Sequence, residues 1–280
     1  MALARRHGLA LFALVAFSSF FIAFPAFAQT PSPFASWQND EGTILRGIGG
    51  PIPDWDIVAG GGVAVIPDYE GSNEYSIVPA PVIDIRYKDI AFLSTGEGLG
   101  VNLLHGQNYR AGIAFGYDVG HSEHASRFIN GTGGIPPSVE PRVFAEWFWL
   151  PFIVSADIRR VLGGTNGMAG DLGIYMSVIG TENFVVFAGP SVTAADNHYM
   201  QNSFGVGTTQ ANPNSRFAPY RAEGGLANAN FGISTLYHFT EQLMLSTDIG
   251  YERLVGDAAG SPLVQSRNQL GASMTLDYEF

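Results

Sequence analysis

The chain has 280 residues, with 14 basic and 25 acidic residues, a formal net charge of −11 and no cysteine. The absence of cysteine excludes disulfide bonds and a lipid-modified N-terminal cysteine. The acidic balance argues against binding to nucleic acid by long-range attraction, so no nucleic-acid partner is expected. Yet 46% of the residues are hydrophobic, and no apolar stretch of about 18 residues that could form a membrane helix follows residue 28.

Residues 1–28 have the pattern of a secretory signal peptide. Arg5 and Arg6 precede an almost entirely apolar run, and Ala26-Phe27-Ala28 forms an A-x-A cleavage site. The alternative is a retained membrane helix, but the run is short for a span of about 20 residues. We therefore expect cleavage after Ala28 and export from the cytoplasm.

Residues 29–55 are rich in Pro, Gly, Ser and Asn and show no hydrophobic period. Such a segment is typical of irregular structure rather than of a helix or strand. We expect it to form a periplasmic lead-in or a plug segment, followed by one domain over residues 56–280.

From residue 56 onward, apolar and polar residues alternate in many short segments. In the last segment, Leu270, Met274 and Leu276 share one face, whereas Asp277 and Glu279 share the other. A strand sends successive side chains to opposite faces, whereas a helix would scatter these acids around its circumference. The alternation therefore predicts an all-β domain.

The pattern predicts twelve strands, joined alternately by short and by long polar connections. The expected strands are 56–66, 76–88, 90–95, 98–104, 109–120, 139–150, 152–163, 168–180, 184–195, 228–239, 243–255 and 268–280. The segment 90–104 could instead be one bent strand, and ten strands is the alternative count. An even count with short turns on one side is typical of an antiparallel up-and-down transmembrane β-barrel.

Aromatic residues near the strand ends favour this barrel over a soluble sheet with one wet face. They match the girdles that mark both membrane interfaces: Tyr87, Tyr109, Trp147, Trp149, Phe152, Phe184, Tyr237, Phe239 and Phe280. Pro79, Pro81 and Pro190 fall inside expected strands, where each removes a backbone donor. We expect β-bulges at these prolines, or strand ends that lie outside the hydrocarbon layer.

Charged residues recur on the face of the strands that would point into the barrel. They are Arg86, Lys88, Arg110, Arg142, Glu146, Asp157, Arg159, Asp171, Asp248, Glu252, Asp277 and Glu279. One interpretation is a charge-lined passage or ligand site. The other is a network of ion pairs that closes the lumen, which the interleaving of both signs favours.

One cluster, His121-Ser122-Glu123-His124, resembles a metal or hydrolase site. Two histidines three residues apart form an incomplete ligand set, and a Ser/His/acid site requires partners that the sequence does not place. We interpret the cluster as the polar start of a loop, with an outer-rim lipid hydrolase as the alternative. No catalytic, cofactor-binding or metal-binding residue is assigned.

Several short patches recur in one known family. They include Pro67, Tyr69, Gly71, Ser72, Pro81, Tyr87, Asp257, Ser261 and Pro262, together with the terminal pattern Leu276, Tyr278 and Phe280. In their order and spacing the chain resembles the MipA/OmpV family of outer-membrane β-barrels, the MltA-interacting proteins.

The resemblance implies an outer-membrane location among lipids and a non-enzymatic envelope role. In the best-known member it implies a scaffold that bridges a lytic murein transglycosylase and a bifunctional penicillin-binding protein. It also implies that the outer-membrane assembly machinery recognises the C-terminal strand that ends in Phe280.

Overall fold

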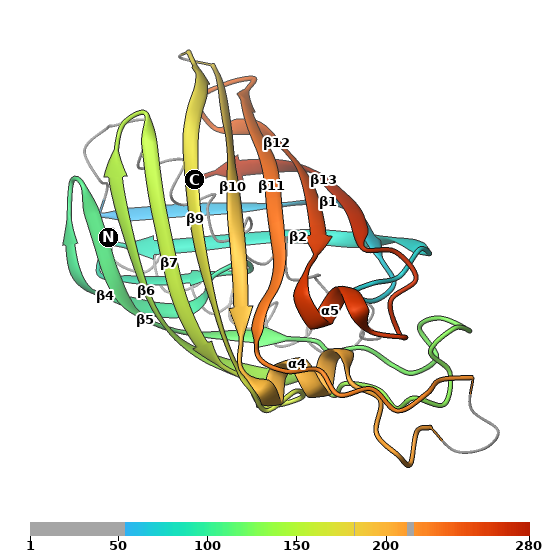
Figure 1. Ribbon diagram of the computed structural model, residues 1–280. Helices are drawn as coiled ribbons and strands as arrows, with labels where there is room; N and C mark the ends of the chain where they lie inside the picture. The colour runs from blue at the N-terminus through green and yellow to red at the C-terminus, as the bar shows by residue number, and fades with distance from the viewer. Residues whose placement is uncertain (1–53, 182, 212–215) are drawn as a thin grey trace, which may run out of the picture.

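The computed structural model describes residues 54–181, 183–211 and 216–280. Over these ranges the chain is nearly all β (Figure 1). The expected signal peptide, its cleavage site and nearly all of the 29–55 segment lie outside the described residues. No helix in the described ranges is long and apolar enough to cross a membrane.

Twelve antiparallel strands form the barrel wall. They are β1 (Trp55–Pro67), β2 (Tyr75–Tyr87), β3 (Ala91–Ser94), β4 (Gly98–Gly106), β5 (Tyr109–Asp118), β6 (Ser138–Trp149), β7 (Phe152–Arg160), β9 (Met168–Gly180), β10 (Phe184–Ala195), β11 (Gly225–His238), β12 (Leu243–Leu254) and β13 (Asn268–Glu279). Consecutive wall strands pair with one another, and β1 pairs with β13 to close the barrel. The predicted twelve-stranded barrel is therefore confirmed, and 90–104 forms two strands.

The connections differ strongly between the two ends of the barrel. One end has only short turns, which corresponds to the periplasmic side of an outer-membrane barrel. The other end has long connections that contain two short helices, α4 (Asn197–Phe204) and α5 (Gly256–Gly260), and the two-residue strand β8 (Leu162–Gly163), which extends the pairing of β6. Figure 1 shows both helices at this outer end.

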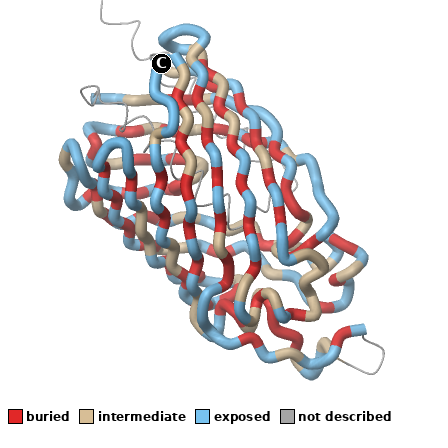
Figure 2. The backbone as a smooth tube through the Cα atoms, turned by 45° about the horizontal axis from the view of Figure 1, so that its top comes forward, coloured by how far each residue is buried: buried red, intermediate tan, exposed pale blue. Residues whose placement is uncertain are grey.

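Burial follows the alternation that the sequence predicts. Along β13, Leu270, Met274 and Leu276 are exposed on the outside, whereas Thr275 and Asp277 are buried inside. Figure 2 shows the same alternation of buried and exposed residues along most wall strands. The outer surface is thus apolar and the interior largely polar, as a lipid-facing barrel requires.

The prediction of β-bulges is wrong at all three prolines, in β2 and in β10. Pro79 and Pro81 pair with Val63 and Gly61 in an uninterrupted register, and Pro190 pairs regularly with Phe231 on β11. Pro79 and Pro81 are tolerated because β3 pairs only with residues Asp84–Tyr87 of β2. The earlier part of β2 therefore has no partner strand on that side, and a missing N–H there costs no ladder hydrogen bond.

The glycines of β1 allow close contact with β13. A β-carbon on Gly62 would overlap the backbone of Met274, and one on Gly60 would overlap that of Leu276 and Asp277. Figure 1 shows β1 and β2 crossing the back of the barrel at a large angle to β9–β12. Glycine at these positions permits the sharp turn of the wall where the barrel closes.

Candidate functional site

The half of the lumen near the short turns is filled by side chains. A cluster of buried apolar residues occupies much of it: Val58, Val82, Phe148, Ile153, Tyr175, Val185, Phe187, Leu236 and Met244. These residues come from eight wall strands and lie at inward-facing positions near the periplasmic ends. They pack as a core rather than line a passage.

Beside the apolar cluster lies a buried ion-pair network, named here the arginine network. It consists of Arg86, Arg110, Asp84, Glu97 and Glu146. Glu97 accepts hydrogen bonds from Arg110 Nη2 at 2.5 Å and from Arg86 Nη2 at 2.6 Å. Arg110 also binds Glu146 through Nε and through Nη2, the latter at 2.8 Å, and Arg86 binds Asp84 at 2.8 Å.

Aromatic rings complete this packing. The guanidinium of Arg110 lies 5.5 Å from the ring centre of Phe144 and 5.9 Å from that of Phe92, within range of cation–π attraction. The arginines and carboxylates are nearly balanced in number, and all five are at least nine-tenths buried. This half of the lumen therefore fits the closed-network interpretation of the inward charges.

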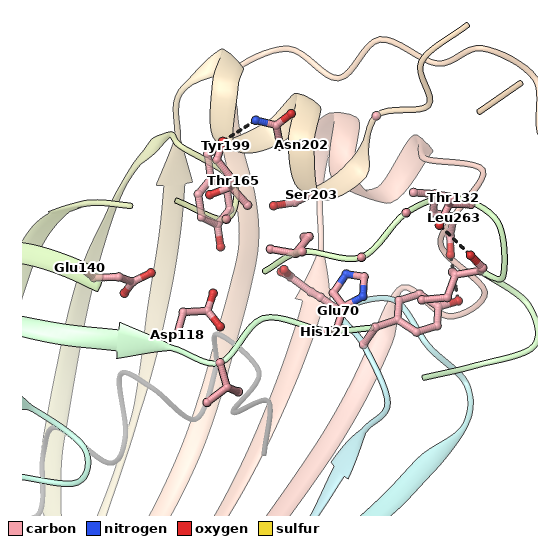
Figure 3. Close-up of a pocket in the computed structure, with 18 of the residues that line it drawn as sticks. Glu70, Asp118, His121, Thr132, Glu140, Thr165, Tyr199, Asn202, Ser203 and Leu263 are labelled. Carbon is pink, nitrogen blue, oxygen red and sulfur yellow. Dashed lines mark hydrogen bonds between the residues drawn. The ribbon is translucent and has the colours of Figure 1, made fainter. Parts of the chain in front are cut away.

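A cavity of about 290 Å³ lies at the other end, beneath the long connections. We name it the acidic chamber. Its lining includes Glu70, Asp118, His121, Glu140 and Arg159. Figure 3 shows Asp118 and Glu140 on neighbouring strands, with Glu70 and His121 near them on the loop side.

The chamber and the lumen next to it hold more carboxylates than cations. Arg159 pairs with Asp171, with Asp157 at 3.4 Å and with Glu140 at 3.6 Å. No other arginine or lysine of the described chain is among the residues that line the cavity. One guanidinium therefore faces several carboxylates, in contrast to the balance in the arginine network.

Glu252 of β12 adds to the excess. Its side chain is 1% exposed, and neither carboxylate oxygen has a hydrogen-bond partner among the described residues. Glu70 and Asp171 lie close enough to it for their charges to interact. A buried carboxylate without a donor or a cation is unfavourable, and this arrangement is one that a bound cation would relieve.

Glu70 lies on the loop between β1 and β2 and receives one long hydrogen bond, from Asn228 Nδ2 at 3.4 Å. Burial raises the pKa of Glu70 to about 7, although Asn228 and Arg159 act in the opposite direction. Because this pKa is above the ordinary value, the associated stability is complete below about pH 4.5 and is lost as the pH rises through about 7. The charge of the chamber thus changes near neutral pH.

Two further inward carboxylates are held by hydroxyl groups. Asp248 accepts from Ser234 at 2.6 Å and from Ser273 at 2.9 Å. Asp277 accepts from Thr275 at 2.8 Å and from Ser246 at 2.9 Å. Asp248 lies near the middle of the barrel, and Asp277 lies nearer the periplasmic end, opposite Met244.

The roof of the chamber brings together patches that are far apart in sequence. Tyr69 donates to the carbonyl of Leu263 at 3.1 Å, and the carbonyl of Gly71 accepts from Gln265 N at 2.8 Å. Gly71 has a φ of +99°, which favours glycine, and Ser72 beside it is fully buried. The patches around Pro67–Ser72 and Asp257–Pro262 thus meet in one packed cap.

The cap continues into the longest connection. Ser261 donates to the carbonyl of Phe204 in α4 at 2.6 Å, and Tyr220 donates to the carbonyl of Asp257 at 2.8 Å. The helix α4 begins where Asp196 accepts from Tyr199 N at 2.8 Å. The sequence predicts a loop over 196–225 and does not indicate this helix.

Other predicted residues lie away from the cap. Pro81 faces outward on β2, and Tyr87 packs against Trp55 at the periplasmic rim, with ring centres 4.7 Å apart. Lys88 does not join the lumen charges: it lies in the turn after β2, with a φ of +50°, and pairs with Asp54 at 3.6 Å near solvent. Glu279 is half-buried at the end of β13.

The cluster around His121 is divided by the structure. His121 lines the chamber, and burial lowers its pKa. His124 is exposed and lies 3.8 Å from Glu123, while Ser122 Oγ accepts from the backbone N–H of His124. The two imidazoles therefore do not share one site, and no group of three or more metal-ligating side chains occurs among the described residues.

The set of inward charges predicted from the sequence leaves out four of the charged residues that matter most. Asp118 and Glu140 occupy inward positions, and their parity with Arg110 and with Arg142 on the same strands could have found them. Glu70 and Glu97 lie in connections, where alternation carries no information about direction.

The comparisons with known proteins bear on this fold and cap. The family model described as MltA-interacting protein MipA matches residues 59–280. The chain belongs to the MipA family. The match covers nearly the whole barrel of this MipA-family chain, including both patches that form the cap.

Several solved outer-membrane structures are similar to the chain. OprD from Pseudomonas aeruginosa is 10% identical with a TM-score of 0.36, over 82% of this chain and 66% of OprD, just under two thirds of that chain. The NanC porin is 9% identical with a TM-score of 0.38, over 81% of this chain and 100% of its own. OmpT of Vibrio cholerae is 7% identical with a TM-score of 0.33, over 81% and 97%. A search of curated proteins gave no match.

The family and the closed barrel together identify an outer-membrane β-barrel protein. In its terminal strand, Leu276, Tyr278 and Phe280 face the lipid side, and the rings of Tyr278 and Phe280 lie 4.9 Å apart. Phe280 N donates to the carbonyl of Ile57 at 3.0 Å, so the terminal residue takes part in barrel closure.

Proposed function

We propose that this MipA-family barrel is a non-enzymatic envelope protein that docks murein-remodelling enzymes, a lytic transglycosylase and a penicillin-binding protein, at its periplasmic end. The observation that carries the proposal is the family match over residues 59–280, because the family is described by its interaction with MltA. The filled half of the lumen near the short turns supports the proposal, since a core of this kind gives a rigid platform rather than an open pore.

The periplasmic rim offers exposed side chains for such docking. Trp149 and Leu150 at the turn between β6 and β7 are 72% and 55% exposed. Exposed aromatic and aliphatic groups at a turn are suited to serve as anchors in a partner pocket. We therefore expect the β6–β7 turn to contribute to the interface.

The experiment is a binding measurement with the full-length barrel in phospholipid vesicles and a purified lytic transglycosylase. Leu150→Glu at the turn should weaken binding by about tenfold, the effect of losing one moderate anchor. Arg221→Glu, in an exposed outer connection, is the matched control and should leave binding unchanged. Failure of the native protein to retain any murein enzyme from envelope extracts would contradict the proposal.

A second function, a binding barrel for small cationic solutes, is favoured by the carboxylate excess of the acidic chamber. Ammonium and guanidinium groups are the chemistry that would compensate Glu70 and Glu252. Calorimetry on the vesicle-bound barrel should detect propylammonium but not propionate. Because the half of the lumen near the short turns is filled, we further expect no steady conductance in planar bilayers. A stable conductance would favour a channel instead.

A further inference from the structure

The barrel wall is shorter between β2 and β5 than elsewhere, because the two strands between them are short. β3 has four residues and β4 has nine, whereas β2 has thirteen. Because β3 pairs only with Asp84–Tyr87, residues 75–83 of β2 have β1 as their only partner strand. The last backbone hydrogen bond across this line runs from Thr95 N to Ile83 O at 2.9 Å. The unpaired stretch between β2 and β5, on the outer-end side of this hydrogen bond, is named the β2–β5 seam.

The seam lies at the depth of the lipid hydrocarbon. At about 3.4 Å per residue and a tilt of about 45°, four residues of β3 raise the 95–97 turn by roughly 10 Å. The apolar band of an outer-membrane barrel is about 25 Å tall. Ile77 on the outer part of β2 is 75% exposed, and Phe115, which pairs with Leu99 at the rim of the seam, is 55% exposed, so the lipid-facing surface around the seam is apolar.

The free edge of β2 is unsuited to a further strand. The backbone N and O of Ile83 both face Thr95, and residues two and four positions earlier in a strand face the same side. Those residues are Pro81 and Pro79, which have no N–H to donate. This excludes β-pairing with a second copy across these positions and removes two donors that hydrocarbon could not satisfy.

The acidic chamber reaches this seam. Thr95, Gly96 and Tyr117 belong to its lining together with Glu70 and Asp118. Tyr117 is 60% exposed, and its hydroxyl lies 3.5 Å from the carbonyl of Thr95 at the lower rim. Above the seam, Ser126 Oγ donates to Glu74 at 2.6 Å and ties the outer connections together. The seam is thus bounded by β2, by β5, by the 95–97 turn and by the Ser126–Glu74 contact, and the cavity extends to the exposed Tyr117 beside it.

We propose that the ligand of the acidic chamber is a cationic amphiphile: its ammonium group binds beside Glu70 and Asp118, and its single alkyl chain passes through the β2–β5 seam into the outer leaflet. This inference rests on the cation-binding function proposed above. The ammonium head needs a counter-charge, which the carboxylates of the chamber supply. The alkyl chain needs no hydrogen-bond partner, so it suits the seam and the hydrocarbon outside it.

The test uses the full chain in phosphatidylcholine vesicles and a dodecylammonium probe that carries a photoreactive diazirine at the end of its chain. Cross-links should concentrate on residues 77–83, 95–99 and 115–117, as mapped by mass spectrometry. Glu70→Gln should reduce them by about tenfold, the effect of losing one charge contact. Glu241→Gln, at the opposite end of the barrel, is the control and should reduce nothing.

A second variant separates the seam from the chamber. Gly96→Trp places bulk at the lower rim and should block dodecylammonium cross-linking while propylammonium still binds; a heat-shift gel verifies that the barrel folds. If cross-links were spread evenly around the barrel while propylammonium still bound, the proposed passage of the alkyl chain through the seam would be wrong, and the cation-binding proposal for the chamber would stand. If the native protein did not bind propylammonium at all, both the seam proposal and the cation-binding proposal would be wrong.

Discussion

The two halves of the lumen use buried charge in opposite ways. In the arginine network, Arg86 and Arg110 face Asp84, Glu97 and Glu146, and the carboxylates are bound by guanidinium groups. In and beside the acidic chamber, Arg159 pairs with Glu140, Asp157 and Asp171, and Arg142 adds a second nearby positive charge. Glu252 has no hydrogen-bond partner in the described chain. The same inward face of the same barrel is therefore sealed at one end and electrostatically incomplete at the other.

This difference separates structure from function. A buried ion pair with good geometry holds the surrounding strands in one arrangement, although its net contribution to stability is small. A buried acid without a counter-charge is unfavourable and needs a proton or a cation. Such unbalanced groups in a cavity indicate a binding site, which is why we assign ligand recognition to the outer half and closure to the inner half.

The largest expected effect is the loss of Arg110. Arg110→Met leaves Glu97 and Glu146 buried with their shared cation removed, and we expect the free energy of unfolding to fall by about 3–5 kcal/mol. Urea unfolding in phospholipid vesicles, followed by tryptophan fluorescence, measures it. Arg253→Met, an exposed arginine hydrogen-bonded to Asn268, is the control and should change stability by less than about 0.5 kcal/mol.

Two matched Glu→Gln changes, one in each half of the lumen, test whether removing a buried charge lowers or raises the free energy of unfolding. Glu97→Gln removes a charge that two arginines bind, so stability should fall by about 2–3 kcal/mol. Glu252→Gln removes a charge that no cation compensates, so stability should stay unchanged or rise in the same urea experiment. A loss above about 1 kcal/mol for Glu252→Gln would show that its carboxylate has a stabilising partner.

A change in ligand affinity with pH is the next expected effect. With a pKa of about 7, Glu70 is mostly protonated at pH 6 and mostly ionised at pH 8. Propylammonium affinity should therefore increase by up to about tenfold over this range, as one carboxylate becomes charged. Titration calorimetry at pH 6, 7 and 8 measures it, and Glu70→Gln should remove the dependence. An affinity that falls as the pH rises would contradict the assignment of Glu70.

The fold was predictable because it is encoded locally and repeated. The alternation along β13, for example, fixes which face of the strand meets lipid, and it does so without knowledge of any neighbour. The short turns and the even strand count then determine the barrel. The prolines of β2 were harder, because whether a missing N–H matters depends on how far β3 extends along its neighbour.

The site was less predictable because it depends on partners across the barrel. The mixed signs of Arg86, Glu146 and Asp171 suggested one interleaved network, yet the structure divides the inward charges into a nearly balanced group and an acidic group. Glu70 and Glu97 enter the lumen from connections, where no period applies. The contact between Tyr69 and Leu263 joins loops 194 residues apart in the chain, which short-range patterns do not encode.

The smallest expected effect concerns two basic residues that the alternation treats alike. Arg86 and Lys88 share parity, but Arg86 is 6% exposed and paired within the lumen, whereas Lys88 lies in a turn and forms an exposed pair with Asp54. Lys88→Met should change the free energy of unfolding by less than about 0.5 kcal/mol, because exposed ion pairs contribute little. Arg86→Met should cost several times more in the same urea titration. Equal losses for the two variants would mean that Lys88 reaches the lumen after all, and that strand parity continues through the turn.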